Sequence, residues 1–311
     1  MKSPRLSIVV PVKDERDSLS QLLREIRSAV DAPFEGAWEL LFVDDGSRDG
    51  SWQELEKLAL EEPRIRAWRL RNNCGKAAAL SLAFSHCRGE YVATLDGDLQ
   101  DDPQELVEMW KMLEEEKLDL VSGWKKVRRD PWHKTIPSRF FNWVVSRVVG
   151  KRMHDYNCGI KFYRREVVQS LHLYGDFHRF IPAMAHWMGF RIGEHIVQHR
   201  PRQHGVSKYG VTRLVSGFLD LISLLFLHKF AVKPLHFFGL IGLLLFLLGG
   251  VIAVWFTCQW IATGALHVRP LMVLGMTALI MGIQFISLGL LGEMINSRGD
   301  HSVPVADELG K

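Results

Sequence analysis

The C-terminal third of the chain contains two long runs without charged side chains, and these constrain the fold more than any other feature. Residues 235–291 hold one arginine and no lysine, aspartate or glutamate. Within them, Leu235–Thr257 and Leu271–Leu291 are each long enough to cross a bilayer as a helix, which takes about 20 apolar residues. The short connection between them predicts a transmembrane hairpin with both ends on one side. The alternative is two helices buried in a soluble core, where charge-free runs of this length are rare.

Basic residues flank the hairpin at its outer ends, where Lys229 and Lys233 precede it and Arg298 follows it. Only Arg269 lies between the two apolar runs. Cytoplasmic loops carry an excess of Lys and Arg, so both ends of the hairpin are expected in the cytoplasm. The apolar stretch Leu6–Val12 is too short for a signal peptide and is followed at once by charged residues. We therefore expect an integral protein of the cytoplasmic (inner) membrane whose large N-terminal part faces the cytoplasm.

The segment before the hairpin is apolar but is interrupted by charged side chains, which is typical of a helix that lies along a membrane surface. The predicted layout is therefore a cytoplasmic domain at 1–210, an amphipathic juxtamembrane helix at 211–234, the transmembrane hairpin at 235–291 and a cytoplasmic tail at 292–311. The formal net charge of +4 is too small to indicate a nucleic-acid partner and suits a protein on an anionic leaflet.

Residues 1–125 alternate between β-rich apolar runs and segments with helical periodicity. Strands are predicted near 6–12, 38–43, 65–70, 91–95 and 118–121, and helices lie between them. Ser18 is predicted to cap the first helix. This alternation indicates an α/β domain with a mainly parallel sheet.

Carboxylates gather where three of the predicted strands end. The residues concerned are Asp14 and Glu15 after the first strand, Asp44 and Asp45 after the second, and Asp96, Asp98 and Gln100 after the fourth. Open parallel sheets bind ligands at the carboxyl ends of their strands. Oxygen ligands gathered at that edge favour Mg²⁺ or Mn²⁺ holding phosphate oxygens. An acidic turn in solvent is the alternative, and Asp101 and Asp102 are assigned to a helix start of that kind.

Four motifs occur in order: "VVPVKDE", "LLFVDDGSRDG", "NNCGKAAAL" and "TLDGDLQDDP". They are followed by "DYNCGIKFYRREV", "HRPRQHGVSKYG" and the apolar hairpin. Together these segments resemble a GT-A glycosyltransferase of family 2, in the polyisoprenyl-phosphate branch that includes dolichol-phosphate mannose synthase. The resemblance covers nearly the whole chain and implies a Rossmann-like GT-A domain. It implies inverting transfer of a sugar from a UDP- or GDP-sugar to undecaprenyl or dolichyl phosphate, with Mg²⁺ or Mn²⁺.

The resemblance also implies roles for individual residues. The nucleotide would contact Pro11, Glu15, Asp44, Asp45, Lys76 and Asp96. The metal would be held by Asp98 and Gln100. The acceptor or its phosphate would meet Arg128, Arg129, Arg139, Arg202 and Ser207. The implied catalytic residues are Asp96, Asp98, Arg202 and Lys208. Guanidinium groups suit phosphate because they bind it with two parallel donors.

The chain departs from several relatives at Gly159, where they carry an acidic residue, and this leaves no catalytic base assigned to the segment that begins at Asp155. A strong base is not required, because a phosphomonoester acceptor is already largely anionic at neutral pH. The enzyme must instead bring two anions together and stabilise the leaving nucleoside diphosphate.

Two other functions stay open. A polysaccharide synthase of the same fold would usually show a Gln-x-x-Arg-Trp motif and more membrane spans, and neither is in the sequence. A non-enzymatic membrane scaffold with a degenerate nucleotide fold is the other. The sugar, the base and the polyprenol are open as well. A homo-oligomer is open too, since Gly242, Gly249 and Gly250 would permit close helix packing.

Overall fold

The structure is a computed structural model. It describes residues 3–126, 142–173, 175–198, 200, 219–226, 233–264 and 269–296. The chain divides into two compact units, residues 1–218 and 219–311.

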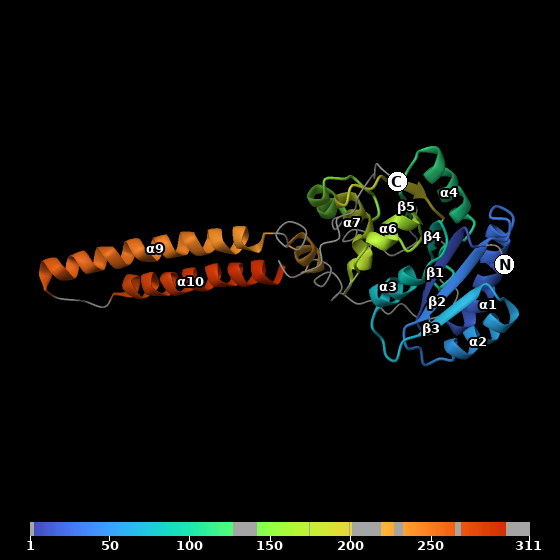
Figure 1. Cartoon of the computed structure of the whole chain (residues 1–311), viewed down its shortest axis with the longest axis horizontal. Coiled ribbons are helices and arrows are strands. Elements are labelled where there is room, and N and C mark those ends of the chain that lie inside the picture. The colour runs from blue at the N-terminus through green and yellow to red at the C-terminus, as the bar shows by residue number, and fades with distance from the viewer. Residues whose placement is uncertain are drawn as a thin grey trace, which may run out of the picture. The chain divides into compact units, whose positions relative to one another are not determined.

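The first unit is built on a seven-stranded mixed sheet (Figure 1). Its strands are β1 (Leu6–Val12), β2 (Trp38–Asp44), β3 (Ile65–Arg69), β4 (Tyr91–Thr94), β5 (Leu120–Trp124), β6 (Lys161–Arg164) and β7 (Ile192–Ile196). Their order is β3-β2-β1-β4-β6-β5-β7. All pairs are parallel except the two that β6 makes with β4 and β5. The predicted mainly parallel α/β sheet is therefore confirmed.

Helices cover both faces of the sheet. They are α1 (Arg16–Val30), α2 (Ser51–Glu61), α3 (Lys76–His86), α4 (Glu105–Glu115), α6 (Arg165–Ser170) and α7 (Ile181–Trp187), with the 3₁₀ turn η1 (Phe177–Phe180). One layer contains α1 beside α2 and α4, and the other contains α3 beside α6 and η1. The strand β1 shows why, because it is apolar on both sides and its side chains alternate between the two layers.

The main core forms between the sheet and the layer that contains α1. Leu6, Ile8 and Val10 project from β1 into the same buried cluster as Leu22 and Ile26 of α1. Each such side chain contributes about 1.5–3 kcal/mol when it leaves water. On the other face, α3 packs on β1 and β2. Because α3 is rich in alanine, its backbone can come close to the sheet.

The elements that follow β5 in the first unit were not anticipated from the sequence. They include β6, α6, η1, α7 and β7. The strands β6 and β7 are short, at four and five residues, and β7 shows mixed burial, so neither has the long apolar signature of β1 or β2. Their place in the sheet comes from tertiary pairing, which local patterns do not specify.

The second unit contains the two long apolar helices, α9 (Pro234–Thr263) and α10 (Pro270–Asn296). Both are long and apolar enough to cross a membrane, with mean hydropathies of 2.7 and 2.1. Figure 1 shows them running side by side as a hairpin. A further helix at 219–226 falls within the predicted juxtamembrane segment, whose remaining parts at 211–218 and 227–232 lie outside the described residues.

Glycines allow α9 and α10 to touch at the backbone. A Cβ on Gly249 would lie 2.5 Å from the Gly275 carbonyl oxygen, and one on Gly242 would lie 2.7 Å from that of Gly282. A Cβ on Gly250 would meet nothing within 4 Å. Gly242 and Gly249 therefore allow α9 and α10 to pack closely within the hairpin, as small residues do in other helix pairs in membranes.

Gly249→Ile is expected to destabilise the hairpin, because the new side chain would overlap the α10 backbone, and overpacking costs about 1–3 kcal/mol. The neighbouring Gly250→Ile is the matched control, since its side chain enters open space. Thermal aggregation of the detergent-solubilised protein measures the difference. We expect a lower midpoint for Gly249→Ile only, and equal midpoints for the two variants would contradict the packing described here.

Candidate active site

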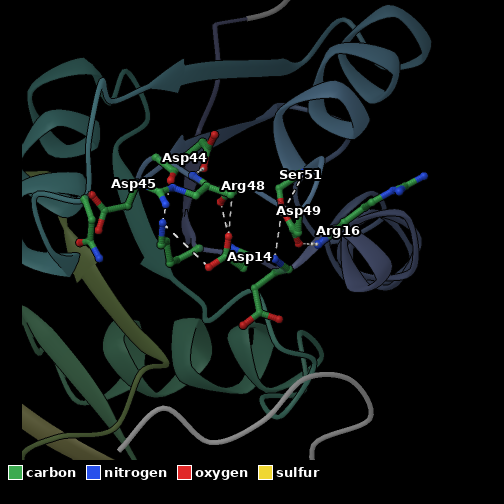
Figure 2. Close-up of polar contacts among 12 residues, drawn as sticks. Asp14, Arg16, Asp44, Asp45, Arg48, Asp49 and Ser51 are labelled. Atoms are coloured by element: carbon green, nitrogen blue, oxygen red, sulfur yellow. Dashed lines mark hydrogen bonds and ion pairs between the residues drawn. The ribbon is translucent and has the colours of Figure 1, made fainter.

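The turns that follow β1 and β2 are locked together by polar contacts (Figure 2). Asp14 lies in the left-handed region with a φ of 52°. Its backbone N–H donates to Ser47 Oγ at 2.8 Å, and its Oδ1 accepts from the Arg48 N–H at 2.9 Å. Because β1 and β2 are parallel neighbours, both turns lie at the same edge of the sheet.

The start of α1 is fixed by the second of these turns. The Arg16 N–H donates to Asp49 Oδ2 at 3.0 Å, and the Glu15 N–H donates to Ser51 Oγ at 3.0 Å. Glu15 is the first residue before α1, so the prediction that Ser18 caps this helix is wrong. The Ser18 hydroxyl instead donates to the Gly97 carbonyl at 2.6 Å, which ties α1 to the loop after β4.

The two acids at the end of β2 differ in their surroundings. Asp44 is fully buried, accepts from the Ser47 N–H at 2.9 Å and lies 3.4 Å from Arg69 Nε. Asp45 accepts from the N–H groups of Cys74 and Gly75 at 2.6 and 3.0 Å. Asp45 thereby holds the loop that leads into α3, and a direct contact between its carboxylate and a nucleotide stays a prediction.

The first acid after β4 pairs with the first residue of α3. Lys76 Nζ contacts Asp96 Oδ1 in a short ion pair. Burial by itself would raise the pKa of Asp96, but the Lys76 ammonium outweighs it and holds that pKa well below its usual range. Asp96 is therefore ionised at neutral pH, and this pair lies at the predicted nucleotide edge. Pro11, half-buried at the end of β1, lines the same pocket as Lys76 and Asp96.

A tight turn presents the two predicted metal ligands. Leu99 is buried and has a φ of 60°, a strained conformation for a leucine. The turn brings the Gln100 N–H to 3.2 Å from Asp98 Oδ1. A carboxylate and an amide oxygen suit Mg²⁺ or Mn²⁺, which commonly use one or two protein ligands and complete their shell with phosphate oxygens and water. The described residues contain no group of three or more acids, histidines or cysteines able to hold a metal.

Asp101 does not behave as a solvated helix-start acid, so that assignment is wrong. It is 2% exposed, and its Oδ1 lies 2.7 Å from Lys125 Nζ at the end of β5. Burial would lower the pKa of Lys125, but the Asp101 carboxylate outweighs this effect and raises it. Asp102 is also engaged, with its Oδ2 at 2.5 Å from an Arg200 guanidinium nitrogen. These two pairs fix the residues that follow the predicted metal ligands Asp98 and Gln100.

The antiparallel strand β6 brings a distant segment to the same place. Because β6 runs opposite to β4, the residues before β6 approach the carboxyl end of β4. Thr94 Oγ1 donates to the Gly159 carbonyl at 2.9 Å, and a Cβ on Gly159 would overlap the Asp96 carboxylate. The absence of a side chain at Gly159 is thus what makes room for the Asp96 carboxylate.

A pocket opens behind Asp96, on the side of β6. Besides Asp96, its polar lining comes from Lys76, Thr94, Asn157, Lys161, Tyr163 and His178. Sequence reasoning gave no role to Asn157, Lys161 or His178, although the first two lie within the segment "DYNCGIKFYRREV". Six predicted residues, Arg128, Arg129, Arg139, Arg202, Ser207 and Lys208, lie outside the described residues.

Asp101→Ala is expected to cost about 3–5 kcal/mol of folding stability, because it leaves the buried Lys125 ammonium without its carboxylate. Chemical denaturation of the N-terminal unit within the full chain measures this loss. Glu108→Ala is the control, since its pair with Lys111 is exposed and such pairs contribute about 0–1 kcal/mol. Adding Lys125→Met to Asp101→Ala is expected to recover part of the loss. Equal effects of the two single substitutions would refute the role of the buried pair.

Comparison with known proteins gives one family. A family model described as glycosyl transferase family 2 matches residues 7–171. A dodecaprenyl-phosphate galacturonate synthase from Rhizobium johnstonii is 37% identical, with 95% of this chain and 88% of that protein covered. An undecaprenyl-phosphate 4-deoxy-4-formamido-L-arabinose transferase from Edwardsiella ictaluri is 33% identical, covering 93% and 88%.

A solved mannosyltransferase from Pyrobaculum calidifontis, in complex with GDP-Man and Mn²⁺, resembles this chain in fold. The TM-score is 0.52 at 18% identity, and the match covers 94% of this chain and 88% of that one. The GT-A fold predicted from the sequence motifs is thus confirmed. A family model that matches more than half of the chain, together with relatives above 30% identity along nearly all of it, shows that this protein belongs to glycosyl transferase family 2.

Proposed function

We propose that this glycosyltransferase moves a sugar from a nucleotide diphosphate donor to a polyprenyl phosphate, with inversion at the sugar carbon. The proposal is carried by a combination found in one chain. Lys76, Asp96 and Asp98 lie at the sheet edge predicted to bind the nucleotide, and two helices of the same chain are long enough to cross a membrane. Relatives named as polyprenyl-phosphate enzymes match nearly all of this chain. A polyprenyl substrate stays in the bilayer, so an enzyme anchored there meets it without extraction.

The proposed location is the cytoplasmic membrane, with the catalytic unit in the cytoplasm. The charge-free helices α9 and α10 support a membrane anchor. The basic residues at the outer ends of the hairpin, Lys229, Lys233 and Arg298, support the orientation.

In the proposed mechanism, Asp98 and Gln100 hold a divalent cation. Bound there, Mg²⁺ or Mn²⁺ would act as a Lewis acid that stabilises the charge on the departing diphosphate. The strained turn at Leu99 fixes the Asp98 carboxylate before substrate arrives, which lowers the reorganisation needed during reaction. Lys76, the first residue of α3, adds a cation at the carboxyl edge of the sheet and keeps Asp96 ionised.

The acceptor side requires charge screening more than proton removal. A polyprenyl monophosphate is largely deprotonated at neutral pH, so it can attack without a strong general base. This fits the glycine at position 159, where an acid would collide with Asp96. We assign the screening of the two anions to the basic residues Arg128, Arg129, Arg139, Arg202 and Lys208, and a contact with the acceptor phosphate to Ser207.

Asp98→Ala is expected to lower turnover by about 100-fold or more, because it removes the charged metal ligand. Release of nucleoside diphosphate by the purified protein measures it, with UDP- and GDP-sugars, undecaprenyl phosphate and either Mn²⁺, Mg²⁺ or chelator. Glu108→Gln on the outer surface of α4 is the control and should match the wild type. Unchanged turnover in Asp98→Ala would exclude this metal site, and lipid-independent release alone would refute the acceptor.

Gly159→Ala is expected to lower turnover about 10-fold or more, because the new methyl group displaces the Asp96 carboxylate from its place beside Lys76. A double-mutant cycle with Asp96→Asn tests this cause. If both changes act on the same carboxylate, their effects on kcat/KM will be clearly less than additive. Fully additive effects on kcat/KM would indicate general damage to the structure instead. So would a Gly159→Ala variant whose melting temperature lies well below that of the wild type.

A further inference from the structure

The pocket behind Asp96 contains a lysine that the proposed mechanism does not use. Lys161, the first residue of β6, is 3% exposed. Its ammonium donates to the Cys158 carbonyl in a short hydrogen bond. Among the described residues no carboxylate lies within ion-pair distance of it. A buried ammonium with one neutral acceptor is costly unless an anion joins it.

The pocket as a whole carries one positive charge in excess. Lys76 and Asp96 balance each other as an ion pair, and Lys161 adds a second ammonium. His178 in the same lining is neutral, because burial lowers its pKa far below the usual range. Burial also lowers the pKa of Lys161 to about 8, so it still carries its proton for most molecules at neutral pH.

The position of the pocket separates it from the predicted metal site. Its lining includes Asp96, Gly159 and Lys161 but neither Asp98 nor Gln100. A donor whose diphosphate is held through a cation at Asp98, and which extends from there toward β6, would place its sugar beside Lys161.

We propose that the donor sugar carries a carboxylate and that Lys161 receives it. This inference rests on the proposed function and names its donor class, a nucleoside diphosphate hexuronate. The charge-assisted pair would satisfy the buried ammonium, and Asn157 and Tyr163 in the same lining offer further hydrogen bonds to the sugar. A neutral hexose would leave the ammonium buried without an anion, which disfavours it. The galacturonate relative at 37% identity agrees with this class, while the formamido-arabinose relatives supply the competing outcome.

The test compares donors that differ only in this carboxylate, namely UDP-galacturonate with UDP-galactose and GDP-mannuronate with GDP-mannose. Transfer to undecaprenyl phosphate is measured with Mn²⁺ for the wild type, Lys161→Met, Lys161→Arg and the surface control Lys111→Gln. We expect the wild type to prefer one uronate over its hexose. Lys161→Met should lose about 100-fold in kcat/KM for that uronate, with a much smaller change for the hexose. Lys161→Arg should keep part of the preference, and Lys111→Gln all of it.

Calorimetric binding of each donor pair with Mn²⁺ and without acceptor gives a readout independent of transfer. Selective loss of uronate binding in Lys161→Met, with a melting temperature near that of the wild type, supports the inference. An equal loss for uronate and hexose would make Lys161 a structural or diphosphate residue and overturn it. Efficient lipid-dependent transfer of a hexose in preference to its uronate by the wild type would overturn it while leaving the proposed function intact. Tight uronate binding without any lipid-dependent transfer would keep this donor class and refute the acceptor.

Discussion

Mutual repulsion among carboxylates at one edge of the sheet is the constraint on which the site depends. Asp44, Asp45, Asp96 and Asp101 all lie at or after the carboxyl ends of β2 and β4, where their charges would oppose folding. Each has a different counterpart: a guanidinium, two backbone N–H groups, the Lys76 ammonium and the Lys125 ammonium. These partners come from β3, the loop before α3, α3 itself and the end of β5, so neutralising the edge also fixes the elements around it.

The direction of β6 gives this edge its second half. In a fully parallel sheet, only the loops that follow strands lie at this edge. Because β6 is antiparallel to its neighbours, the segment that precedes β6 lies at this edge as well. Gly159 therefore reaches the Asp96 carboxylate, and Lys161 the pocket beside it, from about 65 positions further along the chain. The turns after β1, β2 and β4 and the pocket beside Asp96 are thus brought together by the β4–β6 ladder and by the packing of α3 against α6 and η1.

The sequence was sufficient for the strong local signals. The strands β1 and β2 follow from apolar runs, and α1, α2 and α4 follow from helical periodicity. The helix α3 follows from its alanine content and the hairpin from its lack of charged residues, and the motif order predicted the family. It was insufficient where tertiary contacts decide. The local sequence predicts Asp101 as an acid at a helix start, but in the structure it pairs with Lys125. It predicts Ser18 as a helix cap, but the Ser18 hydroxyl donates to the Gly97 carbonyl. Lys161 lies within the segment "DYNCGIKFYRREV", but the segment does not reveal its burial, which is a property of the assembled sheet.

The contact between Gly159 and Asp96 has an evolutionary consequence. The two positions share one small volume, so a side chain at 159 and a carboxylate placed as in this structure exclude each other. A relative with an acid at position 159 must therefore hold the aspartate that follows β4 in another position. A relative with glycine at 159 leaves room for that aspartate to approach β6. We expect the two positions to covary within the family, so that position 159 divides it into two geometries of the same edge.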